Sequence, residues 1–213
     1  MHTHVVDARL LVALGEVFAL AIPDRAGCRT GLEHAVVQEL VRCPAVRDLV
    51  APVLGAQAFA FRATLFDKSP RANWLVAWHQ DRVVPVRARS EAAGFGPWAH
   101  KREGVFVQPP TAVLEQLLAV RIDLDGSGAG NGGLRVLPGT HRHGVLEPDR
   151  IAELACAQLP VTCDVALGGA LCLRPLLLHS SSRATIVGHR RVVQLEFAAV
   201  PLPGGVEFAA CVR

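Results

Sequence analysis

The stretch Asn73–Asp81, which reads NWLVAWHQD, predicts a short strand that runs directly into a His-x-Asp pair. Side chains at positions i and i+2 of a strand point to the same face. His79 and Asp81 can therefore present an imidazole nitrogen and a carboxylate oxygen side by side. Two later residues extend the pattern: a distant histidine, His179, and an arginine eleven residues after it, Arg190.

These residues form the set that a mononuclear iron(II) site needs. Two histidines and one carboxylate can occupy one triangular face of an octahedron and leave three positions open, an arrangement typical of non-haem iron(II) oxygenases. His179 follows the most apolar stretch of the chain, Leu176–Leu178, and precedes three serines. This switch from apolar to polar residues predicts a strand end that opens into a site.

Arg190 starts a predicted strand that is otherwise poor in charge. If its guanidinium points into the protein, it needs an anionic partner, because an unpaired buried charge is costly. A planar, bidentate guanidinium suits a carboxylate. The alternative is that Arg190 faces solvent and Arg191 faces inward, since neighbouring residues of a strand point to opposite faces.

The remaining pattern predicts an α+β fold in a single domain, residues 1–213, with a helical N-terminal part (about 1–56) backing a jelly-roll core (about 57–200). Leu10–Ile22 is interpreted as a core segment. Glu33–Leu54 has helical spacing and is expected to be broken at Pro44 and Pro52. Strands are expected at 58–66, 73–78, 117–124, 134–137, 161–165, 170–173 and 190–199, and a helix at 148–158.

Residues 82–110 are expected to form a long ordered loop. Gly94, Gly96 and Pro97 punctuate it, and Phe95 and Trp98 favour order. Loops of this length are usually functional or disordered. Because this one leaves directly from the His-x-Asp pair, it is predicted to close over the site and help select the substrate.

Composition excludes several classes of function. The chain has 213 residues and a net charge of +3, with no basic stripe of the kind that binds nucleic acid. No apolar run is long enough to span a bilayer. Its six cysteines stand singly, which favours reduced thiols in a cytoplasmic protein. A small molecule is therefore the expected partner, with neither nucleic acid nor membrane.

Three sequence blocks, in this order, resemble the phytanoyl-CoA dioxygenase family of iron(II)/2-oxoglutarate-dependent oxygenases. They are Trp78–Asp81 (WHQD), Asn131–His141 (NGGLRVLPGTH) and His179–Ser181 (HSS), the last followed by Arg190-Arg191 and Phe197. The Asn-Gly-x-Leu-x-Val-x-Pro-Gly-Thr-His segment is the family's own signature. The resemblance covers roughly residues 57–199.

The resemblance implies a double-stranded β-helix and an iron(II) ion held by His79, Asp81 and His179. It implies 2-oxoglutarate and O2 as co-substrates, with Arg190 gripping the far carboxylate of 2-oxoglutarate. Further family positions that contact this co-substrate match Ser181, Gln80 and Trp98. The family's co-substrate lysine has no clear match, and Lys68 is a conceivable substitute. His141 and His143 match a structural turn and are left out of the metal set.

The expected reaction is hydroxylation of a small, polar organic molecule. Related halogenases carry a small residue in place of the carboxylate, which leaves room for chloride, so Asp81 favours hydroxylation. Polar substrates are weakly favoured by Arg82, Arg87, Arg89 and Arg135 near the motifs. Whether Arg62, Thr64, Lys68 or Arg135 line the pocket stays open. Two other readings also stay open: a zinc- or other metal-dependent cupin-like isomerase or hydrolase, and a non-catalytic ligand-binding jelly-roll.

Overall fold

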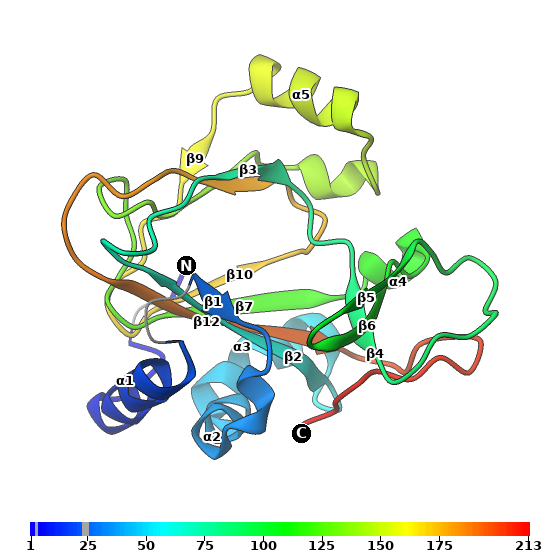
Figure 1. Ribbon diagram of the computed structural model, residues 1–213, viewed down its shortest axis with the longest axis horizontal. Helices are drawn as coiled ribbons and strands as arrows, with labels where there is room; N and C mark the ends of the chain where they lie inside the picture. The colour runs from blue at the N-terminus through cyan, green and yellow to red at the C-terminus, as the bar shows by residue number, and fades with distance from the viewer. Residues whose placement is uncertain (3, 23–25) are drawn as a thin grey trace.

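The computed structural model describes residues 1–2, 4–22 and 26–213, and its core is a pair of facing antiparallel sheets (Figure 1). The major sheet has the order β1-β2-β12-β7-β10: Gly27–Cys28, Phe59–Lys68, Arg190–Ala198, Leu118–Asp123 and Ala170–Leu173. The minor sheet has the order β3-β11-β8-β9: Val76–His79, His179–Ser181, Leu134–Val136 and Val161–Thr162. The predicted α+β fold with a jelly-roll core is confirmed.

Helices cover the outer face of the major sheet (Figure 1). They are α1 (Ala8–Ala21), α2 (Ala35–Arg42) and α3 (Pro44–Leu54), with a short 3-10 turn, η1, at Gly31–Glu33. The largest hydrophobic cluster joins their buried residues to those of β2, β7 and β12. Pro44 starts α3, where the missing N–H costs nothing. The expected break at Pro52 is wrong, because Pro52 lies in the last turn and the helix continues to Leu54.

The inner face of the major sheet is polar. Strand alternation places Arg62, Thr64 and Lys68 of β2 on this face, opposite Arg190, Gln194 and Glu196 of β12. The next strand, β7, adds Arg121 and Asp123 beside Gln194 and Val192 of β12. A row of charged and amide groups therefore faces the minor sheet, instead of the apolar side chains usual in a sandwich core.

The prediction of a long loop over 82–110 is wrong. This segment forms a third antiparallel sheet, order β4-β6-β5 (Val84–Val86, Gly104–Val107, Trp98–Lys101), followed by the short helix α4 at Thr111–Leu114. Its apolar residues Val84, Val86 and Val107 pack into a second hydrophobic cluster with the aromatic rings of β2 and the C-terminal segment. In that cluster Phe61 stacks on Phe208, with ring centroids 4.6 Å apart. This burial orders a stretch whose glycines and prolines suggested a loop.

The remaining elements lie on the outer side of the minor sheet (Figure 1). They are a 3-10 turn, η2 (Thr140–His143), and the helix α5 (Pro148–Ala157). A small cluster of Leu137, Leu146, Leu154 and Leu178 attaches them to the sheet, with Trp78 packed against it. None of the helices in the described part of the chain has the length and apolar character needed to span a bilayer.

Candidate metal centre and co-substrate pocket

The two predicted histidine ligands face each other across a pair of strands. His79 is the last residue of β3 and His179 the first of β11, and they are direct partners in the antiparallel register. Their ring centroids lie 4.2 Å apart. The structure thus corrects one detail of the prediction, because His179 begins a strand that the preceding leucines only lead into.

Asp81 completes the group just beyond the end of β3. Its backbone N–H donates to the carbonyl of Pro175 at 2.9 Å, which anchors the chain after the strand. Asp81 Oδ1 lies 3.9 Å from His79 Nε2, and Oδ2 lies 3.7 Å from His179 Nε2. One ligand atom from each of the three residues falls within 4.8 Å of the others.

Both imidazoles are oriented with Nε2 toward the carboxylate. His79 Nδ1 lies 2.9 Å from the carbonyl of Ala77, and His179 Nδ1 lies 2.8 Å from that of Leu177. Since a carbonyl only accepts, each Nδ1 carries the proton and each Nε2 offers a lone pair. This is the arrangement by which outer groups orient metal-binding histidines.

The electrostatics of the three groups suit a divalent cation. Burial lowers the pKa of His179 to about 4, so its imidazole is neutral at pH 7. Burial disfavours the charge on Asp81, but nearby His179 and Arg62 outweigh this and lower the pKa of Asp81. Two neutral imidazole nitrogens and one carboxylate oxygen are the donor set of non-haem iron(II) sites, so the residues fit this metal.

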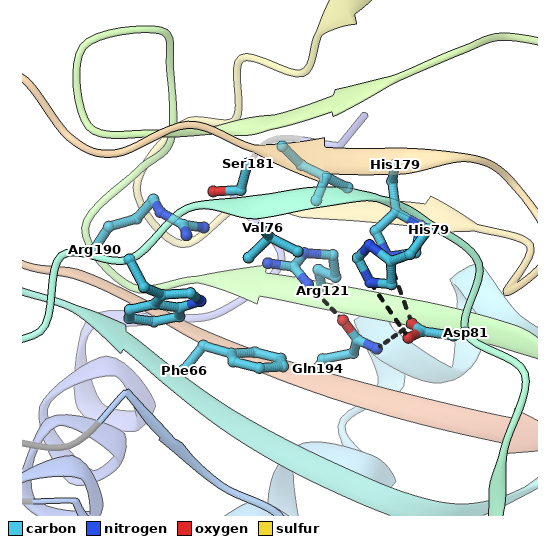
Figure 2. Close-up of a pocket in the computed structure, with 11 residues that line it drawn as sticks. Phe66, Val76, His79, Asp81, Arg121, His179, Ser181, Arg190 and Gln194 are labelled. Atoms are coloured by element: carbon cyan, nitrogen blue, oxygen red, sulfur yellow. Dashed lines mark hydrogen bonds and ion pairs between the residues drawn. The ribbon is translucent and has the colours of Figure 1, made fainter. Parts of the chain in front are cut away.

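A pocket extends from the three residues between the two sheets. Figure 2 shows Arg190 and Ser181 at the end away from Asp81, with Arg121 between. Arg190 is 3% exposed, and its buried Nε has no hydrogen-bond partner. Burial lowers the pKa of Arg190 to about 10, so the group is charged at pH 7. A buried, charged guanidinium with a nitrogen that lacks a partner indicates a site for an anion in this pocket.

Lys68 adds a second positive charge at this end. It is the register partner of Arg190, is almost fully buried, and lies with Nζ 5.2 Å from the centre of the Trp74 ring. Its ammonium donates to Ser181 Oγ at 2.7 Å and to the carbonyl of Ser182. Burial, with Arg190 and Arg121 nearby, lowers the pKa of Lys68 to about 8.

Two residues predicted to contact the co-substrate, Gln80 and Trp98, are not among the residues that line this pocket. The Gln80 amide group donates to the carbonyls of Gly144 and Leu176, each at 2.8 Å, and accepts from the N–H of Leu146 at 2.9 Å. Gln80 therefore ties three segments together and does not line the pocket. Trp98 lies on β5 and stacks on Phe95, also away from the pocket.

Three of the four arginines that weakly favour a polar substrate contact other groups. Arg82 donates to the carbonyl of Leu146 at 3.4 Å, and Arg87 pairs with Glu207 at 2.6 Å. Arg135 lies over the ring of Trp78, 5.6 Å from its centre. None of these three side chains is among the residues that line the pocket.

Sequence reasoning missed two polar residues of the pocket, Arg121 and Gln194. Gln194 could have been found, because it lies four positions after Arg190 on the same strand and so on the same face. Arg121 gave no such signal, since its approach to Gln194 depends on the order of the strands in the sheet. Arg62 was a candidate, but it pairs with Glu196 in the interior.

Comparison with known proteins agrees with this geometry. The sequence model of the phytanoyl-CoA dioxygenase (PhyH) family matches residues 17–192. The chain belongs to this family. Family membership makes the protein a non-haem oxygenase of the iron(II)- and 2-oxoglutarate-dependent class, and the His79, Asp81 and His179 donors fit that metal. No curated protein sequence matches the chain.

Several solved structures share the fold of this PhyH-family protein. One is SnoN, a non-haem α-ketoglutarate-dependent epimerase from nogalamycin biosynthesis, with 17% identity, a TM-score of 0.67 and coverage of 96% of this chain and 84% of that chain. EctD from S. alaskensis, with bound Fe, has 19% identity, a TM-score of 0.66 and coverage of 92% and 71%. HygX from Streptomyces hygroscopicus, with nickel and 2-oxoglutarate bound, has 11% identity, a TM-score of 0.64 and coverage of 92% and 79%. At these identities the likeness concerns the fold.

Proposed function

We propose that this protein is an iron(II)- and 2-oxoglutarate-dependent dioxygenase that hydroxylates a small, polar organic substrate. The observation that carries the proposal is that one pocket has three metal donors at one end and, at the other, the buried Arg190, whose Nε has no hydrogen-bond partner. A dicarboxylate such as 2-oxoglutarate can bind the metal with one end and Arg190 with the carboxylate at its other end.

Different residues of the pocket would bind the metal and the co-substrate. His79, Asp81 and His179 hold the iron, and the backbone carbonyls of Ala77 and Leu177 keep the two imidazoles turned toward it. Arg190 and Lys68 bind the far carboxylate of 2-oxoglutarate by charge-assisted hydrogen bonds. Ser181, already within 2.7 Å of the Lys68 ammonium, fixes that ammonium in place. With iron and 2-oxoglutarate bound, the site supplies oxidation by O2 with release of succinate and carbon dioxide.

Hydroxylation is supported by the intact carboxylate. Asp81 fills the position that related halogenases leave open for chloride. Its pKa is lowered below the usual range, so it is ionised at neutral pH and available as a ligand.

A polar substrate is supported by the wall beside Asp81. The pocket lining on the major sheet includes Arg121 and Gln194, which are joined by a hydrogen bond. Burying an apolar substrate against these groups would remove their remaining contacts with water without replacing them, which is unfavourable. A substrate with hydroxyl, amide or charged groups would replace those contacts.

The test is an anaerobic titration of the purified protein with iron(II) and then 2-oxoglutarate. Binding of both should produce the weak visible charge-transfer band of the chelate, and the Arg190→Ala variant should need far more 2-oxoglutarate to reach it. Succinate release should then rise when polar small molecules are added in air. Stoichiometric zinc binding without any effect of 2-oxoglutarate would instead support the hydrolase or isomerase alternative.

A further inference from the structure

The Asp81 carboxylate has a neighbour that sequence reasoning did not identify. Gln194 Nε2 donates to Asp81 Oδ2 at 3.2 Å (Figure 2). On its other side, Gln194 Oε1 accepts from Arg121 Nη1. Both Gln194 and Arg121 are buried, and they are direct partners in the register of β12 and β7.

The direction of this amide is set by chemistry. A guanidinium has only donors, so Arg121 must face the amide oxygen of Gln194. The amide NH2 is therefore turned toward Asp81. Arg121 is itself held by the sheet, with its guanidinium carbon 5.6 Å from the centre of the Phe66 ring. The result is a chain of three groups, Arg121–Gln194–Asp81, that ends on one oxygen of the carboxylate.

We propose that Gln194 is a positioning residue for the metal: held by Arg121, it keeps the Asp81 carboxylate in the orientation that places its two oxygens 3.9 and 3.7 Å from the two histidine Nε2 atoms. This inference rests on the proposed iron site. Outer groups of this kind typically change metal affinity about 10- to 100-fold.

An amide is suited to this place because it is neutral. If the Arg121 guanidinium paired with Asp81 directly, its positive charge would compete with the metal for the carboxylate. The Gln194 amide donates a hydrogen bond while leaving the full negative charge of Asp81 for the cation. Gln194 thus keeps the positive charge of Arg121 away from the Asp81 carboxylate. The hydrogen bond from Arg121 still fixes the orientation of the Gln194 amide.

Three substitutions separate positioning from a merely structural role. Gln194→Met preserves length and volume but removes the donor. Gln194→Asn keeps the amide one carbon further back, and so it loses the reach to both partners. Gln194→Glu keeps an acceptor for Arg121 but places an oxygen in front of Asp81. If Gln194 served only as a partner for Arg121, the Glu variant would bind metal normally.

The control is Thr64→Val, at the position directly beside Gln194 on the adjacent strand and on the same face of the sheet. It changes a buried polar group without touching Asp81. All proteins are compared without metal by circular dichroism and melting temperature. Cobalt(II) affinity is then measured anaerobically by calorimetry, together with the visible spectrum of the bound cobalt ion.

The expected result is that the Met, Asn and Glu variants bind cobalt(II) at least tenfold more weakly than the unmodified protein, with an altered spectrum. Thr64→Val should stay within about twofold. If the Met or Glu variant folds and binds cobalt(II) with unchanged affinity and spectrum, Gln194 does not position Asp81. The proposed iron site would still stand. Failure of the unmodified protein to bind the metal would overturn the iron site itself and this inference with it.

Discussion

Arg190 and Arg191 are adjacent in the chain, but their side chains point to opposite faces of strand β12. Arg190 lines the pocket at the end away from the three metal donors. Arg191 points to the other side, where its Nε and Nη2 bind Asp125 at 3.0 and 2.5 Å. The alternation of strand side chains makes only one of the two available to a ligand between the sheets.

Arg190→Ala should therefore weaken 2-oxoglutarate binding by at least tenfold. A charge-assisted hydrogen bond contributes about 1.5–3 kcal/mol, and tenfold corresponds to about 1.4 kcal/mol. The matched control is Arg191→Ala, which removes the same side chain from the other face. Calorimetric titration of the cobalt(II)-loaded proteins measures both. If Arg191→Ala gave the larger loss, the assignment of Arg190 would be wrong.

Replacing His179 by Ala should abolish stoichiometric binding of iron(II) or cobalt(II), because only two donors would remain. The control is His143→Ala, a histidine in the η2 turn outside the donor group. Metal content after anaerobic loading and desalting measures the outcome. Full retention of metal by the His179 variant, with an unchanged fold, would contradict the metal site.

The affinity for 2-oxoglutarate should decrease as pH rises from 7 to 9. Burial lowers the pKa of Lys68 to about 8, so its ammonium loses charge in this window, whereas the pKa of Arg190 is about 10. The charged lysine is the form that binds a carboxylate, so deprotonation weakens binding. Lys68→Met should bind more weakly at pH 7 and show little change up to pH 9. An equal slope in both proteins would exclude Lys68 as the titrating group.

Removing one partner of the buried Arg62–Glu196 pair should destabilise the fold strongly. The two side chains are 9% and 2% exposed, and Arg62 Nη2 binds Glu196 Oε1 at 2.6 Å. Glu196→Ala leaves a buried, unpaired guanidinium, and the free energy of unfolding should fall by about 3–5 kcal/mol. The double variant Arg62→Met/Glu196→Leu should lose less. Chemical denaturation measures both, and a double variant less stable than Glu196→Ala would contradict this reasoning.

Amide hydrogens across Trp98–Val107 should exchange slowly in the ligand-free protein. The strands β5 and β6 pair over this range, from Trp98 opposite Val107 to Lys101 opposite Gly104. Hydrogen exchange followed by mass spectrometry would detect this protection. Rapid exchange that slows only when metal and 2-oxoglutarate bind would instead support the predicted closure of this segment over the site.

The sequence by itself determined the parts of the site that depend on local geometry. The short His-x-Asp spacing predicted that His79 and Asp81 would lie together, although Asp81 follows the end of β3, and strand alternation separated Arg190 from Arg191. Family motifs added His179 and Ser181. These relationships hold within a few residues of the chain and need no knowledge of the neighbouring strands.

Only the tertiary structure decided which groups from distant strands meet. Arg121 and Gln194 come together because β7 and β12 pair in one particular register, and Lys68 reaches Ser181 because the two sheets face each other. Gln80 follows His79 directly, yet its amide group binds two segments that the chain brings in from elsewhere, one at Gly144–Leu146 and one at Leu176. Sheet order and register are set by burial summed over many non-local contacts, so no short stretch of sequence specifies them.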